Sequence, residues 1–213
     1  MVHPAPIRPP APAEPDPPDD LAGVAAGVQV CRRCDLWRGA TQGVPGEGPR
    51  QARLMLVGEQ PGDREDLTGH PFVGPAGAVL DRALAEAGAV REQCYVTNAV
   101  KHFKHEVRGK RRIHSKPDAG EVRACRWWLD NERRLVRPRV IVALGATAAA
   151  AVLGRPVAVM KARGPAGALE DGATGFVTIH PSMLLRIPEP AAKAAAYREF
   201  VRDLRGAWRL GQD

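Results

Sequence analysis

Short, continuous runs of apolar residues alternate along this chain with longer stretches in which apolar residues recur at helical spacing. Four runs have the length of buried strands, and they span 54–58, 94–100, 140–145 and 176–179. Stretches of helical character lie between and after them, at 76–87, 118–136, 147–153 and 190–208. Because strands that alternate with helices form parallel βαβ units, this order predicts an α/β fold with three layers, α/β/α, around a central four-stranded parallel sheet.

The last predicted helix carries a single apolar stripe. The stripe recurs with the period of an α-helix and consists of Tyr197, Phe200, Val201, Leu204 and Trp208. We interpret it as the side of the helix that packs on the core.

The carboxyl ends of the four predicted strands mark the place to search for a site, because ligands of open parallel sheets bind beyond those ends. The loops in question follow Val57, Val100, Leu144 and Ile179. The chemically unusual residues of the chain lie in three of these four loops.

The length of 213 residues suits one domain, and a hydrophobic content of 44% is enough for a core. Residues 1–20 contain eight prolines, which predicts a disordered tail ahead of a single folded domain at 21–213. No run reaches the roughly 18 apolar residues of a membrane span, and the first residues lack a signal-peptide pattern. We therefore expect a monomer without membrane contact, located in the cytoplasm or, in a bacterium, at the nucleoid.

Most of the formal net charge of +7 is concentrated in one segment. Residues 101–116 contain seven lysines or arginines and a single glutamate. Such a segment favours phosphate contacts and salt-dependent binding to a polyanion. The alternative is a solvated basic loop with no chemical role.

Two cysteines form a C-x-x-C pair at Cys31 and Cys34, and Cys125 lies far downstream on a predicted helix. Thiolates at this spacing indicate a metal centre, either structural zinc or an iron–sulfur cluster, although a redox pair or free thiols would have the same spacing. Cys94 is a candidate fourth ligand by residue type, but it opens a buried strand. His102 follows the carboxyl end of that strand, on a loop that could reach a cluster.

The loop after the first strand, at 58–66, combines glycines with four carboxylates. Glycine lets the backbone approach a ligand, and carboxylates can perform acid–base chemistry, although a solvated polar loop looks the same. Phe72 follows between proline and glycine residues, a setting that suits stacking on a flat heterocycle better than core packing.

Four motifs occur in order along the chain: C-x-x-C from Cys31, G-E-Q-P-G-D-x-E-D with T-G-x-P-F-V-G-x-A-G, T-N-x-V-K, and H-P-S-x-L-L-R. Together they resemble the iron–sulfur uracil-DNA glycosylases of family 4, from Cys31 to about Trp208. This resemblance implies the uracil-DNA glycosylase fold and uracil-containing DNA, preferably single-stranded, as the partner.

Two departures from family 4 are similar to the X-type uracil-DNA glycosylases. Gln60 stands where family 4 commonly has alanine, and His102 stands where it usually has a cluster cysteine. A basic insert at 108–114 then contains K-R-R-I-H, the hallmark of the X-type enzymes. In that subclass the histidine of this loop, here His114, becomes covalently joined to DNA after uracil is excised.

The resemblance implies a [4Fe-4S] cluster held by Cys31, Cys34, His102 and Cys125, with Cys94 as the less favoured substitute for His102. It also implies residues that bind the uracil nucleotide and its flanking strand, namely Gly58, Phe72, Asn98, Lys110, Arg111, Arg112, Ser182 and Arg186. In this reading Phe72 stacks on the extruded ring and Asn98 pairs with its polar edge. Segment 181–186 enters the groove of the DNA, with Leu184 and Leu185 as a wedge.

The implied catalytic residues are Glu59, Gln60, Asp63, His114 and His180. His180 stabilises the departing uracil anion, and His114 attacks the sugar C1′ in place of water. Glu59 accepts the imidazole proton or orients the ring, and Gln60 and Asp63 shape the pocket or position water. Two alternatives remain: a conventional glycosylase that turns over, and a non-catalytic, cluster-containing DNA-binding or damage-sensing protein in which the pocket residues only recognise uracil.

Overall fold

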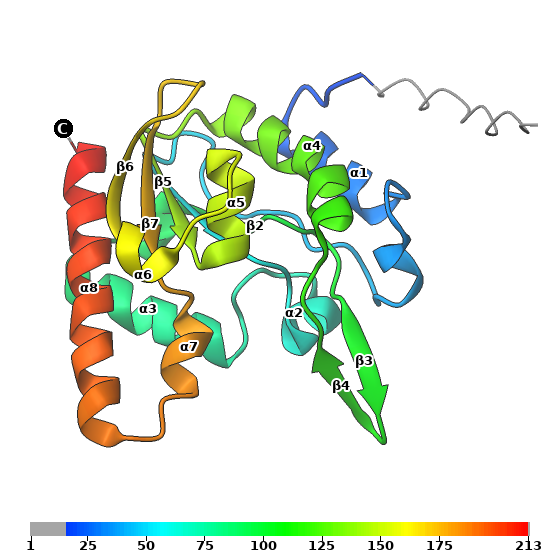
Figure 1. The fold of residues 1–213 in the computed structure, drawn as a ribbon. Coiled ribbons are helices and arrows are strands. Elements are labelled where there is room, and N and C mark those ends of the chain that lie inside the picture. Colours follow the sequence, from blue (N-terminus) through cyan, green and yellow to red (C-terminus); the bar gives the residue numbers. More distant parts are fainter. Residues whose placement is uncertain (1–15, 213) are drawn as a thin grey trace, which may run out of the picture.

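The computed structural model describes residues 16–212, and most of the expected proline-rich tail lies outside the described residues. The described chain forms three layers, with helices on both faces of a central sheet (Figure 1). The first helix, α1 (Leu21–Gln29), begins after Asp20, whose side chain accepts a hydrogen bond from the Gly23 amide. No helix in the described range is long and apolar enough to cross a membrane.

The central sheet has the strand order β2-β1-β5-β7-β6. Its parallel strands are the four expected from the apolar runs: β1 (Leu54–Gly58), β2 (Cys94–Asn98), β5 (Val140–Leu144) and β7 (Thr174–Thr178). The expected number of four is wrong, because β6 (Gly164–Ala168) pairs antiparallel with β7 at the edge. Its sequence, GPAGA, contains no apolar run, so it carries no strand signal of its own.

Alternate residues of β1 point to opposite faces of the sheet and are all buried. On one face Leu54 and Leu56 pack with α3 (Pro75–Ala87) and α8 (Pro190–Gln212). On the other face Met55 and Val57 pack with α4 (Ala119–Val136) and α5 (Ala146–Leu153). The α/β class with three layers is therefore confirmed.

The expected apolar stripe of the last helix packs on the core. Phe200, Val201 and Leu204 are buried, and the half-buried Tyr197 and Trp208 pack against the same cluster.

A third apolar cluster lies between α1 and α4. It contains Cys31 and Cys125 together with Val28, Val100 and Trp128. Two of the cysteines of the candidate metal site are thus part of one buried cluster.

The basic segment is a second, two-stranded sheet formed by β3 (His105–Arg108) and β4 (Arg111–His114). It extends from the body of the protein as a hairpin (Figure 1). His114 pairs with His105 at the base of the hairpin, and the turn passes through Gly109, which has a positive φ of 61°. The remaining short elements are η1 (Asp35–Arg38), α2 (Asp63–Thr68), η2 (Arg91–Gln93), α6 (Val159–Ala162) and α7 (Pro181–Leu185).

Candidate active site

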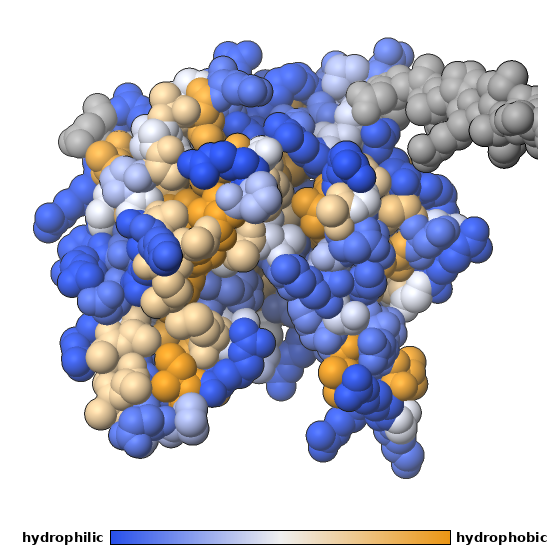
Figure 2. Space-filling view, in the orientation of Figure 1, coloured by the Kyte–Doolittle hydropathy of each residue, from blue (hydrophilic) through white to orange (hydrophobic). Residues whose placement is uncertain are grey.

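A cleft of about 930 Å³ opens at the carboxyl ends of the parallel strands. Figure 2 shows the hairpin as a mostly hydrophilic projection, with a recess between it and the rest of the surface. The residues predicted from sequence that line the cleft are Glu59, Gln60, Asp63, Phe72, Asn98, His114, His180, Ser182 and Arg186. The fold therefore gathers most of the candidate residues, from five separate segments, around one cavity.

Three residues form the buried end of the cleft. Phe72 is 6% exposed and has a positive φ of 58°, which is unusual for an aromatic residue. Asn98, the last residue of β2, is buried, and its Oδ1 atom has no hydrogen-bond partner. A Cβ atom at Gly58 would overlap Asn98 Oδ1 and lie 2.6 Å from Phe72 Cζ, so glycine leaves both groups in place.

The unpaired oxygen of Asn98 indicates a ligand that donates a hydrogen bond, because buried polar atoms are rarely left without a partner. Phe72 offers a flat surface beside it, and its ring centre lies 6.0 Å from that of His180. This end of the cleft suits a flat ring with a polar edge.

His180 follows β7 and caps α7. Its Nδ1 atom accepts a hydrogen bond from the Ser182 amide at 3.2 Å and lies 2.8 Å from the Ser182 hydroxyl. Because Nδ1 accepts, the proton of the neutral ring is on Nε2. Burial lowers the pKa of His180 to about 4, against the attraction of the Glu59 charge, so the ring is neutral near pH 7. A neutral ring with a free N–H can donate to an oxygen that gains negative charge.

Glu59 lies directly after β1 and contacts the hairpin. Its Oε1 atom is 3.3 Å from Nε2 of His114, the last residue of β4. The Glu59 side chain is 23% exposed and that of His114 is 50% exposed, so the imidazole lies at the mouth of the cleft. The structure thus brings the histidine of the hairpin to the same cavity as Phe72 and Asn98.

Gln60 holds the base of the hairpin. Its Oε1 atom accepts from the Lys104 amide, and its Nε2 atom donates to the carbonyls of Lys104 and Ser115, all at 3.1 Å. These bonds join the two chain segments that enter and leave the hairpin. Gln60 was expected to shape the pocket or position water; it lines the cleft, and its amide also fixes the position of the hairpin.

Arg112 is also an anchor of the hairpin. Its guanidinium lies 2.6 Å from Asp63 and 2.5 Å from Asp66, and it stands over the ring of Phe103. Asp66 has no exposed side-chain surface and also accepts from the Thr41 amide. Both carboxylates are therefore bonded to Arg112. The expected phosphate contact of Arg112 and the expected role of Asp63, which lines the cleft, in shaping the pocket or positioning water stay predictions.

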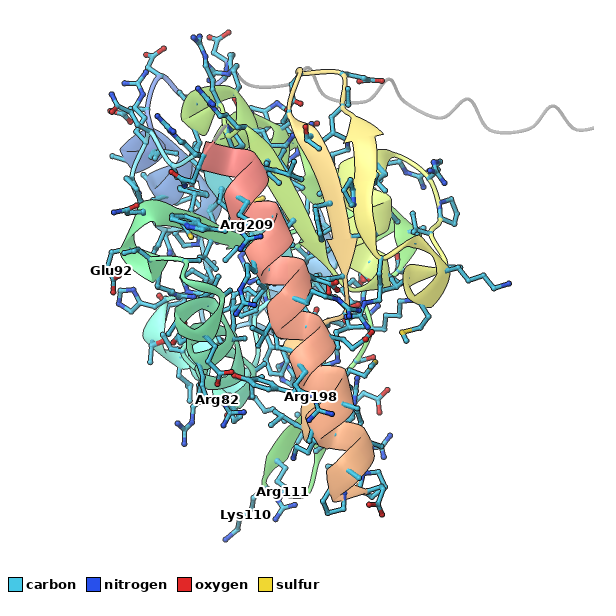
Figure 3. All side chains as sticks on the ribbon, turned by 90° about the vertical axis from the view of Figure 1, so that its left-hand side faces the viewer. Arg82, Glu92, Lys110, Arg111, Arg198 and Arg209 are labelled. Atoms are coloured by element: carbon cyan, nitrogen blue, oxygen red, sulfur yellow. The ribbon has the colours of Figure 1, made fainter. Side chains whose placement is uncertain are left out.

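Two further cations of the hairpin, Lys110 and Arg111, were expected to contact DNA, and that contact stays a prediction. Figure 3 shows Lys110 and Arg111 at the far end of the hairpin, where they extend into solvent. Neighbouring strand residues point to opposite faces, so Arg111 faces away from the side that Arg112 and His114 share.

Only one of the two leucines of the expected apolar wedge is exposed. Leu184 is 1% exposed and belongs to the core beneath α7, so the expectation that it enters a groove is wrong. Leu185 is 43% exposed and lines the mouth of the cleft together with the exposed Arg186.

Three cysteine sulfurs share one pocket beneath α1 and α4. Each accepts a hydrogen bond from an N–H group: Cys31 from the Trp128 indole at 3.1 Å, Cys125 from the Lys101 amide at 3.2 Å, and Cys34 from the Leu36 amide. Burial raises the pKa of Cys125 to about 12, and the nearby sulfurs of Cys34 and Cys31 raise it further. N–H donors aimed at sulfur are the surroundings that thiolate ligands of a cluster require.

His102 is 4% exposed, and burial lowers its pKa, so the ring is neutral as a metal ligand must be. The charge of Arg32, between the two cysteines of the C-x-x-C pair, also lowers its pKa, which places His102 near that pair. Cys94 packs in the core cluster on the opposite face, beneath α3 and α8, with its thiol 3.4 Å from the Val90 carbonyl. It is therefore remote from the other three cysteines.

Within the described part of the chain, no group of three or more His, Cys, Asp or Glu side chains is close enough together to hold a single metal ion. A four-iron cluster is larger than one ion, so its ligands stand further apart around it. The shared pocket, the N–H donors and the neutral imidazole fit the ligands of such a cluster.

Two features of the site have no counterpart among the sequence candidates. Thr147, near the start of α5, donates a hydrogen bond to Oε2 of Glu59. Lys101 was counted with the basic segment, but it is fully buried and forms a 2.7 Å ion pair with Glu132. Its ammonium also donates to the Asn98 carbonyl at 2.8 Å, so it supports the backbone of that residue.

The cavity has the size of a small-molecule site, and its buried end is built for a flat ring with hydrogen-bonding groups on one edge. The exposed cations of the hairpin beside it suit the phosphates of a strand. The fold and the cleft together suit an α/β enzyme that acts on a nucleobase within a nucleic acid.

Comparison with known proteins identifies the family more specifically than the fold and the cleft do. The model of the uracil DNA glycosylase superfamily matches residues 45–205, and the chain belongs to this superfamily. It is 40% identical to a type-4 uracil-DNA glycosylase of Thermotoga maritima over 164 residues, which cover 76% of this chain and 82% of that protein. It is 33% identical to a type-4 enzyme of Pyrobaculum aerophilum over 87% of this chain and 91% of that protein. A type-5 uracil-DNA glycosylase of the same organism is 34% identical over 77% of this chain and 76% of that protein.

The protein is thus a uracil-DNA glycosylase and a hydrolase of DNA repair.

Proposed function

We propose that this glycosylase, after excising uracil from DNA, joins His114 covalently to C1′ of the sugar that lost its base. The observation that carries the proposal is the contact between Glu59 Oε1 and His114 Nε2 at the mouth of the uracil cleft. This contact supports the proposal because it joins an imidazole to a proton acceptor, the two groups that capture of the electrophilic carbon requires.

Uracil must leave the base stack before the cleft can reach its glycosidic bond. Stacking on Phe72 compensates in part for the lost base stacking. Asn98 then accepts from uracil N3–H through its unpaired Oδ1 atom and donates to uracil O4 through its amide. Cytosine presents the opposite hydrogen-bonding pattern, so it would leave buried polar atoms unpaired and bind poorly.

Cleavage of the glycosidic bond moves an electron pair onto uracil and leaves oxocarbenium character on the sugar. The Nε2–H group of His180 donates to uracil O2, where this negative charge gathers. A neutral donor suits this role because its proton stays on the imidazole. The uracil anion takes its proton from water after it leaves.

Capture follows when a lone pair of the His114 ring forms a bond to C1′. The proton on the other ring nitrogen passes to the carboxylate of Glu59, so the product carries a neutral imidazole attached to the sugar. The anchors of the hairpin, Gln60 and Arg112, hold His114 at the cleft before DNA arrives. Such prior positioning raises the effective concentration of the nucleophile far above that of a free imidazole.

Cys31, Cys34, His102 and Cys125 would hold the [4Fe-4S] cluster, which supplies a rigid cross-link between the N-terminal segment, α4 and the loop after β2. The Lys101 amide donates to Cys125 while the Lys101 ammonium supports Asn98. The cluster pocket and the uracil-reading residue are therefore joined through one buried lysine.

A conventional glycosylase with repeated turnover is the second candidate, and the similarity to type-4 enzymes favours it. In that case water attacks C1′, and Glu59 orients the water. A protein that binds uracil-containing DNA without excising the base is a third candidate.

One experiment separates the three. A uracil-containing oligonucleotide is incubated with excess and with limiting protein and then resolved on a denaturing gel. Capture predicts a protein–DNA band that survives heat and detergent, never exceeds one DNA per protein, disappears in His114→Ala and persists in His70→Ala, a histidine outside the cleft lining. Free abasic DNA over many turnovers supports the conventional enzyme, and intact uracil throughout supports the binding protein.

A further inference from the structure

The loop after β5 supplies no candidate residue from sequence, yet it delivers a side chain to the site. Thr147 is the second residue of α5, is 7% exposed, and donates its hydroxyl proton to Oε2 of Glu59. The loop lies directly against the cleft, because a Cβ atom at Gly145 would stand 3.1 Å from Cβ of His180.

The two carboxylate oxygens of Glu59 have separate partners. Oε2 accepts from Thr147, and Oε1 faces Nε2 of His114. With Oε2 held, the carboxylate cannot rotate freely, so Oε1 stays directed at the imidazole. Among the described residues, no other side chain is hydrogen-bonded to Glu59.

The charge state of Glu59 agrees with this arrangement. Burial acts to raise the pKa of Glu59, but hydrogen bonds from His114 and Thr147 outweigh it and lower the pKa below its usual value. These two partners come from β4 and α5 and approach the carboxylate from separate elements. Glu59 is therefore ionised near neutral pH and can accept a proton.

We propose that Thr147 is a positioning residue that orients Glu59 toward His114 and so sets the rate of covalent capture. This inference rests on the proposed function. As the His114–C1′ bond forms, the proton leaving the other ring nitrogen passes to the Glu59 carboxylate. A rotated Glu59 would be out of reach, and the imidazolium would then have to lose its proton to water.

The test compares three variants with the wild type. Thr147→Val keeps the shape of the side chain and removes the donor, whereas Thr147→Ser keeps the donor and removes a methyl group. Thr68→Val is the matched control, because the Thr68 hydroxyl bonds to neighbouring backbone groups: it donates to the Arg64 carbonyl and accepts from the His70 amide. Thermal melting shows whether each variant folds, and Thr147→Ala replaces Thr147→Val if that variant does not.

Two quantities are measured: the single-turnover rate of capture on uracil-containing DNA, and the pKa of Glu59 by NMR titration of ¹³C-labelled glutamate carboxyl groups. We expect Thr147→Val to slow capture about 10-fold or more and to raise the pKa of Glu59, since a hydrogen bond to a charged group is lost. Thr147→Ser should restore both quantities to near the wild-type values, and Thr68→Val should change neither. A structural role alone would not move the pKa of one carboxyl group.

The outcomes separate this inference from the function on which it rests. If the wild type releases uracil but captures no DNA, the proposed function fails, while a raised pKa of Glu59 in Thr147→Val still supports the positioning contact. If the wild type captures DNA and Thr147→Val does so at the same rate with an unchanged pKa of Glu59, the inference about Thr147 is overturned.

Discussion

The guanidinium of Arg112 lies 2.5 Å from Oδ2 of Asp66, a carboxylate with no exposed surface. The pair joins the hairpin to α2, and Asp63 adds a second carboxylate at 2.6 Å. A basic residue in a basic segment is thus neutralised within the protein. Its role is to hold the hairpin, and with it His114, against the cleft.

Removing this anchor should slow capture more than uracil excision. Arg112→Met keeps the length of the side chain but loses both ion pairs, so the hairpin becomes mobile and His114 spends less time at the cleft. We expect capture at saturating DNA to fall on the order of 10- to 100-fold. Hydrogen exchange of the hairpin amides should rise in parallel.

Arg111→Met is the matched control, because Arg111 extends into solvent (Figure 3). It should weaken DNA binding and reduce its salt dependence without changing the capture rate at saturation. Equal capture rates for Arg112→Met and wild type would contradict the anchoring role.

The buried ion pair of Lys101 and Glu132 should respond strongly to the loss of one partner. Lys101→Met leaves Glu132 fully buried without its counterion, which costs about 3–5 kcal/mol of unfolding free energy. The double variant Lys101→Met with Glu132→Leu should recover a large part of that loss, because no uncompensated charge remains. Urea unfolding of the single and double variants measures both values, and equal losses in the two would count against the pairing.

Protein stability should depend on pH through His180. Its pKa is about 4 in the folded protein and near 6.5 when the ring is exposed, so the unfolded chain binds more protons between these values. The stabilisation of the folded state by the neutral ring is fully present above pH 6.5 and is lost as the pH falls toward 4.

Melting temperatures at pH 7.5, 5.5 and 4.5 test this dependence. His180→Gln, which cannot titrate, should show a shallower decline than the wild type over this range. Excision by the wild type should persist at pH 5.5, because His180 still carries its neutral N–H donor there. A decline in melting temperature that is identical in the two proteins would remove the argument for a neutral ring.

Measuring the iron content of cysteine variants should distinguish the expected cluster ligands from Cys94. Cys125→Ser should lose iron and labile sulfide, because Cys125 shares its pocket with Cys31 and Cys34. Cys94→Ser should retain both, since Cys94 lies beneath α3 and α8. His102→Ala should lose or weaken the cluster. Purified protein that contains zinc and no iron would refute the assignment.

The four parallel strands and the stripe on the last helix could be predicted because the information lies in neighbouring residues. A run such as Val140–Leu144 is apolar on both faces, which suits a strand covered on both sides. Strand β6 could not be found in this way, because Gly164–Ala168 carries no such run. It is a strand only because β7 offers an edge with which it can pair.

The hairpin shows that prediction from neighbouring residues has the same limit at the site. The segment reads as a basic loop from its sequence. Its strands form by pairing with each other, and its position at the cleft is fixed by contacts with residues far away in the chain, Gln60 and Asp66. Arg111 and Arg112 are identical neighbours, yet one extends into solvent and the other is bound by two carboxylates. Nothing in their local sequence separates them.

Residue type and order were thus enough to establish the layered α/β architecture, the motifs shared with uracil-DNA glycosylases and the set of side chains able to act. Only the tertiary structure decided which of them meet and which are buried. It brings the Thr147 hydroxyl into a hydrogen bond with Glu59 and buries Lys101 in the core. It also buries Leu184 beneath α7 and leaves Leu185 exposed at the cleft. The reason is physical. Apolar periodicity can be read from residues that are near neighbours in the sequence. A hydrogen bond or ion pair instead requires two groups within a few ångströms of each other. For segments far apart in the chain, that distance is set only when the sheet and its covering helices have formed.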